Sequence, residues 1–179
     1  MASRMLKIRL MRVTLIIAVI ALGGIALSCD PSSPSEALDF TLPTLTGANI
    51  TLSELEGTPV VLNFWSISCS WCRKQLPYLE NVAQQSEGEI KVVAINVGDS
   101  AATVQEFFGD YEPAMIVALN ENREVFVNYC QNYDNSRGYI PFTLFVDSEG
   151  LVQYKKIGAF TSEEELWNTL HDVFGITIP

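Results

Sequence analysis

The most constraining feature of the sequence is an apolar strand that leads, through a short loop, into a helix with two cysteines at its start. Residues 60–64 form a β-branched and aromatic run of strand length, interrupted only by Asn63. From Ser70 onward, apolar residues recur at helical spacing: Leu76, Leu79, Val82 and Ala83. Cys69 therefore lies at or just before a helix N-terminus, and Cys72 lies one turn further on.

This placement suits the two cysteines to redox chemistry. Unpaired backbone N–H groups and the positive end of the helix dipole stabilise a thiolate at a helix N-terminus. They lower the pKa of a cysteine from about 8.5 toward the range in which it attacks disulfides near neutral pH. Cys72 is close enough to Cys69 to close a small disulfide ring, so the residues predict a redox-active pair.

Other uses of a CxxC sequence fit less well. A structural zinc site needs four ligands, whereas the chain has one CxxC and a single histidine, His171, far away along the sequence. Covalent haem attachment needs a histidine directly after Cys72, where Arg73 stands. A purely structural disulfide in an exported protein remains an alternative. We expect no metal and no cofactor other than the disulfide itself.

Residues 1–28 have the pattern of a signal peptide or membrane anchor. An uncharged apolar run over residues 13–28 follows four cationic residues: Arg4, Lys7, Arg9 and Arg12. The run is short for a transmembrane helix, which needs about 20 apolar residues, although an uncleaved anchor is an alternative. The end of the run resembles a bacterial lipoprotein signal, in which Cys29 would carry the lipid. Both arrangements tether the rest of the chain to a membrane, outside the cytoplasm.

The remainder divides into a tether and one domain. Residues 29–37 are rich in proline and serine and offer nothing to bury. Residues 38–179 are enough for one domain with a sizeable core. Without residues 1–28 the chain keeps 11 − 4 = 7 basic and 21 acidic residues, a net charge of −14. A chain with so large a negative charge is not expected to bind nucleic acid or anionic lipid surfaces.

Strand and helix patterns alternate after the cysteine pair. Strands are expected at residues 90–97, 115–119, 142–146 and 151–157, and helices at residues 101–108, at residues 121–133 and after Ser162. Residues 148–150 have the composition of a tight hairpin turn. This order predicts an α/β fold with a central mixed sheet covered by helices on both faces.

A series of short motifs, in this order, resembles the membrane-tethered thioredoxin-like oxidoreductases of the TlpA and ResA type. The motifs are Asn63-Phe64-Trp65, Cys69-x-x-Cys72-Arg73, Pro77, and Ile140-Pro141-Phe142-Thr143-Leu144-Phe145-Val146-Asp147 with Gly150 and Gly158. The stretch from Asp39 to Gly57 is similar to that family's N-terminal hairpin. The resemblance covers residues 38–174 and implies a thioredoxin-like fold with an N-terminal β-hairpin extension and a cis-proline loop.

The resemblance also implies roles for single residues. Cys69 would be the exposed attacking thiolate, and Cys72 the buried thiol that resolves the mixed disulfide. Pro141 would be the cis-proline that lies against the disulfide, although a plain strand-starting proline is the alternative. Ile140 would offer backbone groups to an extended substrate segment. Trp65 would pack beside the loop as a structural residue.

Three positions depart from the family's pattern. Gln75 stands where members commonly have a glutamate that helps to move the proton of the resolving thiol, and Asn63 stands where thioredoxins keep a buried aspartate. Neither amide titrates, so we expect a slower resolving step or a different redox poise. Trp71 precedes the second cysteine, where many relatives have proline. Its side chain would either dock a partner or fill space over the loop.

Two further residues are left without a role in this scheme. Cys130 lies at helical spacing among apolar residues and is expected to be an inert buried thiol, with a regulatory or substrate-linked role as the alternative. His171 lies late in the final helix, far along the sequence from the cysteines, and is expected at the surface.

The resemblance implies an enzyme, a protein-disulfide reductase that acts on exported proteins in the periplasm or at the outer side of the membrane. Its electrons would come from a membrane thiol relay, and apocytochrome c, hence cytochrome c biogenesis, is one implied substrate. The same residues could instead oxidise targets, because direction depends on the reduction potential. A thioredoxin-like module that binds and delivers Cu(I) through two thiolates is an alternative of another class. A peroxidase would need a lone reactive cysteine and ranks last.

Overall fold

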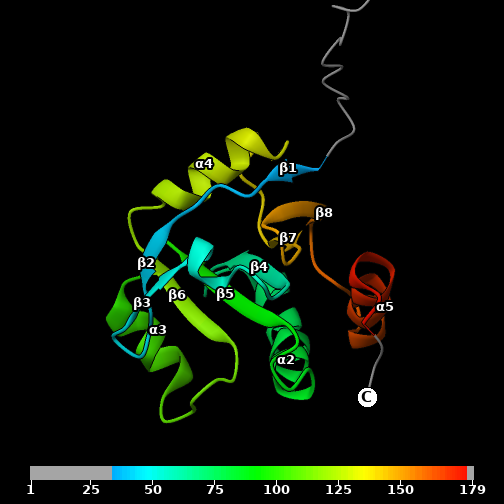
Figure 1. Ribbon diagram of the computed structural model, residues 1–179. Coiled ribbons are helices and arrows are strands. Elements are labelled where there is room, and N and C mark those ends of the chain that lie inside the picture. Colours follow the sequence, from blue (N-terminus) through cyan, green and yellow to red (C-terminus); the bar gives the residue numbers. More distant parts are fainter. Residues whose placement is uncertain (1–33, 177–179) are drawn as a thin grey trace, which may run out of the picture. The chain divides into compact units, whose positions relative to one another are not determined.

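A six-stranded mixed sheet with helices on both faces is formed by the part of the chain that the computed structural model describes, residues 34–176 (Figure 1). The strand order is β1-β8-β7-β4-β5-β6. The parallel strands are β4 (Val60–Trp65), β5 (Lys91–Val97) and β6 (Ile116–Asn120). The antiparallel strands are β7 (Phe142–Val146), β8 (Leu151–Ile157) and β1 (Ser35–Glu36). The predicted α/β fold with a mixed sheet is confirmed.

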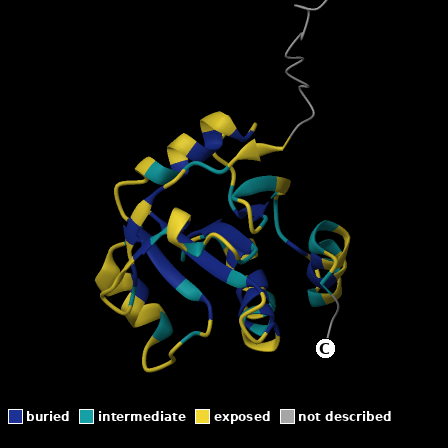
Figure 2. Ribbon diagram, in the orientation of Figure 1, coloured by how far each residue is buried: buried dark blue, intermediate teal, exposed yellow. Residues whose placement is uncertain are grey.

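The helices divide between the two faces of the sheet. The face with the cysteine pair is covered by α2 (Ser70–Gln85), α3 (Ala101–Phe108) and α5 (Glu163–Phe174). The other face is covered by α4 (Glu124–Asn132), the hairpin of β2 (Thr41–Pro43) and β3 (Asn49–Thr51), and the short helix η1 (Leu52–Leu55). Figure 2 shows the strands mostly buried and the outer sides of the helices exposed. The N-terminal hairpin extension is where the sequence predicts it.

Strand β4 shows how the core is divided. Its side chains alternate, so Leu62 and Phe64 pack in the cluster beneath α4 while Val61 and Trp65 pack beneath α2 and α5. All six of its residues are buried, as expected for a parallel strand covered on both faces. The same alternation places Asn63 on the α2 side of the sheet.

One predicted helix begins later than expected. The sequence predicts a helix over residues 121–133, but α4 starts at Glu124. The side chain of Asn122 accepts the N–H of Glu124 at 3.0 Å, and Arg123 has a φ of +62°. The polar residues after β6 therefore form a turn, because their side chains compete for the backbone N–H groups.

The predicted tether reaches into the folded unit. Ser35 and Glu36 pair with Val152 and Leu151 of β8, and the N–H of Ala37 donates to Gly150 at 2.8 Å. Pairing at a sheet edge uses backbone groups alone, so the Pro/Ser-rich composition of this segment does not predict strand β1. The predicted segment 1–28 and the lipidation candidate Cys29 lie outside the described residues. No helix within residues 34–176 has the length and apolarity that crossing a membrane requires.

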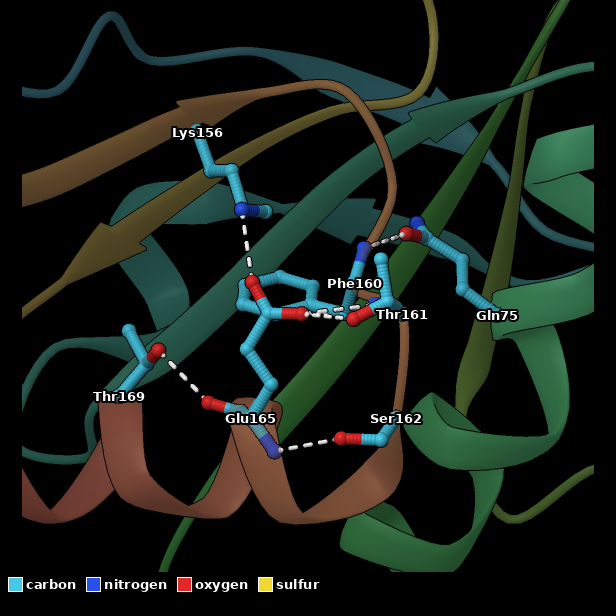
Figure 3. A network of polar contacts seen from close by, with 7 residues as sticks. All are labelled: Gln75, Lys156, Phe160, Thr161, Ser162, Glu165 and Thr169. Carbon is cyan, nitrogen blue, oxygen red and sulfur yellow. Dashed lines mark hydrogen bonds and ion pairs between the residues drawn. The ribbon is translucent and has the colours of Figure 1, made fainter.

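Helix α5 begins directly after its N-cap residue Ser162, where the sequence predicts a helix. Ser162 Oγ accepts the N–H of Glu165 at 3.1 Å. The Glu165 carboxylate accepts from the N–H and the hydroxyl of Thr161, both at 2.8 Å, and pairs with Lys156 Nζ at 2.8 Å (Figure 3). The hydrogen bond from Lys156 is the largest of the effects that lower the pKa of Glu165 to about 2.

We expect Glu165→Gln to lower the free energy of unfolding by about 1 kcal/mol at neutral pH. The folded-state pKa lies below the unfolded value of about 4.3, so this stabilisation is present above that value and is lost as the pH falls toward 2. Urea unfolding at several pH values measures it. Glu164→Gln, an exposed carboxylate on the same turn, is the matched control and should change little. An effect of Glu165→Gln that did not shrink with acidity would contradict this account.

Candidate active site

The cysteine pair lies at the start of α2, at the carboxyl end of strand β4. Cys69 is the N-cap residue of α2, and its sulfur accepts the N–H of Cys72 at 3.1 Å. The two residues form a disulfide with a Cα–Cα distance of 5.2 Å. Cys69 is half-buried, whereas Cys72 is fully buried. On reduction, the helix N-terminus and the Cys72 N–H would both stabilise negative charge on the outer sulfur.

The loop before β7 meets the disulfide from the other side. The Ile140–Pro141 peptide bond is cis, and the Ile140 carbonyl oxygen lies 3.8 Å from Cys69 Sγ. The Pro141 carbonyl accepts the N–H of Gly158 at 2.8 Å, which ties this loop to the end of β8. The structure therefore brings Ile140 and Pro141 to the cysteine pair across 71 positions of sequence.

A buried asparagine, which sequence reasoning missed, shapes this loop. Asn135 accepts the N–H of Tyr139 at 3.0 Å and donates to the Tyr139 carbonyl at 2.8 Å. The same side-chain nitrogen lies 3.4 Å from the sulfur of Cys130. Cys130 is a buried free thiol, and burial raises its pKa. The sequence could have indicated this role, because Asn135 lies in the loop five residues before Ile140 and asparagine side chains often bind nearby backbone groups.

Two charged residues hold the loop between β4 and α2 through Ile67. Asp99 Oδ2 accepts the N–H of Ile67 at 2.9 Å and the side-chain amide of Asn96 at 2.9 Å. Arg73 donates to the Ile67 carbonyl at 2.9 Å. Sequence reasoning missed Asp99, although it follows the strand next to β4. The carboxyl ends of adjacent parallel strands meet at one edge of a sheet, which is where such a residue can reach the loop.

We expect Asp99→Ala to lower kcat/KM for a protein disulfide by about tenfold, because the loop that carries Cys69 loses one of its two anchors. Asp99→Asn keeps an acceptor oxygen and should recover most of the activity. Asp110→Ala removes an exposed carboxylate and is the control for charge. Steady-state kinetics and urea unfolding of the three variants separate loop positioning from stability. Equal losses in Asp99→Ala and Asp110→Ala would refute the role of Asp99.

The two tryptophans near the pair differ in exposure. Trp65 is buried and packs against Phe107 and Phe108, with ring centroids 5.5 and 6.0 Å away. This agrees with the expected packing role. Trp71 is 57% exposed, and Lys74 Nζ lies 4.4 Å from its ring centroid. Trp71 therefore presents an aromatic surface to solvent in the first turn of α2.

The two amides that depart from the family's pattern are both fully buried. Asn63 donates to the hydroxyl of Thr143 at 2.8 Å. Gln75 Oε1 accepts the N–H of Phe160 at 3.0 Å, in the loop between β8 and α5 (Figure 3). Neither side chain titrates, so proton transfer from Cys72 has no carboxylate at these two positions.

The chain resembles known thiol-disulfide oxidoreductases along most of its length. The AhpC/TSA family matches residues 34–155. The thiol-disulfide oxidoreductase ResA of Bacillus subtilis (strain 168) is 32% identical over 149 residues, which are 83% of this chain and 77% of that protein.

Solved structures show the same fold. A secreted disulfide oxidoreductase of Mycobacterium tuberculosis has a TM-score of 0.63 at 24% identity, over 74% of this chain and 95% of that one. The exposed lipoprotein thioredoxin of Streptococcus pneumoniae strain TIGR4 has a TM-score of 0.63 at 22% identity, over 75% and 99%. With its cysteine pair at disulfide distance, the chain belongs to the AhpC/TSA family and is a thiol-disulfide oxidoreductase with a thioredoxin-like fold.

Proposed function

We propose that this enzyme is an extracytoplasmic protein-disulfide reductase that transfers two electrons from its cysteine pair to disulfides of exported proteins. The observation that carries the proposal is the position of the Cys69 sulfur, which is half-buried at a helix N-terminus, 3.8 Å from the Ile140 carbonyl oxygen. An extended substrate segment that paired with the backbone of Ile140 would bring its own disulfide to this sulfur.

The reaction proceeds in two exchanges. The Cys69 thiolate attacks one sulfur of the substrate disulfide, a Cys69–substrate bond forms, and the other substrate sulfur leaves as a thiolate. The Cys72 thiolate then attacks the Cys69 sulfur, forms the Cys69–Cys72 disulfide and releases the second substrate thiolate. Two electrons have passed to the substrate, and a membrane dithiol relay would return the pair to its reduced form.

Two exposed aromatic residues are sequence neighbours of the site residues and would contact the substrate. Trp71 lies two positions after Cys69, and Tyr139, which is 51% exposed, directly precedes Ile140. Aromatic side chains supply a large contact area at a small cost in conformational entropy. We therefore assign Trp71 to substrate binding, together with Ile140 and Pro141.

The N-terminal sequence, residues 1–28, supports the proposed extracytoplasmic location. The similar pneumococcal protein is an exposed lipoprotein and the similar mycobacterial protein is secreted. Both agree with the export-signal pattern of residues 1–28. Lipidation at Cys29, or an uncleaved anchor, would leave the domain facing the periplasm or the outer side of the membrane. Exported proteins with oxidised cysteines, apocytochrome c among them, are then its substrates.

The reduction potential of the Cys69–Cys72 pair tests the direction of electron flow. Trp65 and Trp71 lie close enough to the pair to make tryptophan fluorescence a suitable readout during titration in a thiol redox buffer. A value near or below about −270 mV supports a reductant that is supplied from the membrane. A value near about −120 mV would make the protein an oxidant and overturn the proposed direction.

Delivery of Cu(I) is the alternative of another class. The Cu(I) ligands would be the two thiolates of the reduced Cys69–Cys72 pair, because soft sulfur ligands suit this metal. No observation on the site favours copper over thiol exchange. Titration of the reduced protein with Cu(I), alongside a reductase assay, separates the two functions. Stoichiometric copper binding without any disulfide reduction would replace the proposal.

A further inference from the structure

The side chain of Asn135 binds both backbone groups of Tyr139, the residue directly before Ile140. Its Oδ1 accepts the Tyr139 N–H at 3.0 Å, and its Nδ2 donates to the Tyr139 carbonyl at 2.8 Å. A residue in a neighbouring antiparallel strand would make the same two hydrogen bonds. Asn135 is 1% exposed, so its amide takes the place of a strand partner on the buried side of the loop.

The amide of Asn135 is itself held in place by α4. The Asn135 N–H donates to the carbonyl of Cys130 at 3.1 Å, and the Asn135 carbonyl accepts the N–H of Gly138 at 2.8 Å. Asn135 Nδ2 also lies 3.4 Å from Cys130 Sγ. The loop before Pro141 is therefore attached to a helix of the core through one side chain.

The backbone groups of Ile140 remain open toward the cysteine pair. A residue that precedes proline favours an extended conformation, and successive residues of an extended chain direct their backbone groups to opposite sides. The Ile140 carbonyl oxygen accordingly lies 3.8 Å from Cys69 Sγ. Among residues 34–176, no backbone atom accepts the Ile140 N–H. The N–H of Tyr139 is already used, so a substrate strand that pairs with this loop has to pair at Ile140.

We propose that Asn135 is a positioning residue for substrate binding: it occupies the backbone of Tyr139 and thereby sets the register in which a substrate strand pairs with Ile140 beside Cys69. The inference rests on the proposed function, since it concerns how an exported protein presents its disulfide. The substrate segment is extended and carries a free backbone N–H next to the reacting cysteine. Without the Asn135 amide, Tyr139 competes for the same strand, and the substrate sulfur is no longer aligned with Cys69.

The test compares disulfides with and without a peptide backbone, on the reduced full chain. The first probe is a linear peptide whose one cysteine is joined to an aromatic thiol. The Cys69 thiolate attacks the peptide sulfur, a Cys69–peptide disulfide forms, and the aromatic thiolate leaves and is detected by its colour. The second probe is the symmetrical aromatic disulfide, which has no backbone to pair. Two further peptides carry an N-methyl group on the residue before or after the cysteine, which removes one backbone donor.

In Asn135→Leu we expect the second-order rate constant for the peptide to fall by about tenfold, while that for the aromatic disulfide stays within about twofold. One of the two N-methyl groups should slow the unsubstituted protein by about tenfold but Asn135→Leu hardly further, because both changes remove the same pairing. Asn135→Asp should approach the unsubstituted protein as the pH falls toward about 5, because a protonated carboxyl group again has one donor and one acceptor.

Asn120→Leu is the matched control. Asn120 is also 1% exposed, and its Oδ1 accepts the N–H of Phe126 at 3.0 Å. This variant should lose stability in urea unfolding but keep the rate constants for all probes. Equal slowing with both kinds of disulfide in Asn135→Leu, or N-methyl groups without effect on the unsubstituted protein, would overturn the inference alone. If Asn135→Leu does not fold, an Asn135→Asp variant that fails to recover with acidity overturns it. Failure of the unsubstituted protein to release thiolate from any probe would overturn the proposed function as well.

Discussion

Cys69→Ser should lower kcat/KM for protein disulfides by at least about three orders of magnitude. The thiolate is the nucleophile in disulfide exchange, and a serine hydroxyl is un-ionised at neutral pH. The remaining Cys72 is fully buried, so it offers a protein substrate no accessible sulfur. Reduction of a small disulfide-containing protein, followed over time, measures the loss.

In the same assay, Cys72→Ser should show a different defect from Cys69→Ser. Cys69 would still attack the substrate disulfide, but without a resolving thiol the mixed disulfide would accumulate. Non-reducing electrophoresis and mass spectrometry would detect the trapped complex. Cys130→Ala is the matched control, because this thiol is buried on α4 and burial raises its pKa. It should keep most of the activity. A trapped complex in Cys69→Ser rather than in Cys72→Ser would reverse the assigned roles.

Glu80→Ala should lower the free energy of unfolding by about 3 kcal/mol, the second large effect that we expect. Glu80 lies on α2 and is 7% exposed. Its carboxylate accepts the N–H groups of Ala114 and Met115 at 2.8 and 3.1 Å. It also accepts from the Tyr111 hydroxyl and the Gln84 amide, both at 2.8 Å. Truncation leaves these donors unpaired and frees the segment that joins α3 to β6.

The effect of Glu80 should depend on pH. Burial alone raises the pKa of Glu80, but the hydrogen bonds from Ala114, Met115, Tyr111 and Gln84 outweigh it and lower the pKa overall. The stabilisation is therefore present above the unfolded value of about 4.3 and is lost as the pH falls through the lower folded value. Urea unfolding across this range measures it. Glu89→Gln, an exposed carboxylate shortly after α2, is the control. Equal stabilities of Glu80→Ala and Glu89→Gln would contradict the role of Glu80.

Local patterns in the sequence predicted most of the elements correctly. The run from Val60 to Phe64, the helix after Cys69 and the helix after Ser162 depend on neighbours within a few positions, and each is confirmed. The start of α4 was wrong by three residues because side chains of the preceding turn bind backbone N–H groups. Edge strand β1 was missed because its pairing with β8 uses backbone alone.

The site was predictable only in part. Cys69 and Cys72 could be identified from spacing, and Ile140 and Pro141 from the family resemblance. The contacts of Asp99 with Ile67 and of Asn135 with Tyr139 had no distinctive sequence pattern. Glu80 has the appearance of an ordinary polar position on an amphipathic helix, yet it is the buried acceptor for four donors.

The sequence by itself determined the order of strands and helices, the cysteine pair at a helix N-terminus and the acidic charge of the domain. These properties depend on composition and on periodicities of two or 3.6 residues, which a single chain segment carries. Only the tertiary structure decided that Ile140 lies against Cys69 and that Gln75 reaches Phe160 across 85 positions. Such contacts depend on how β4, β7 and α2 pack together, and the direction of a buried side chain follows from that packing rather than from its neighbours in sequence.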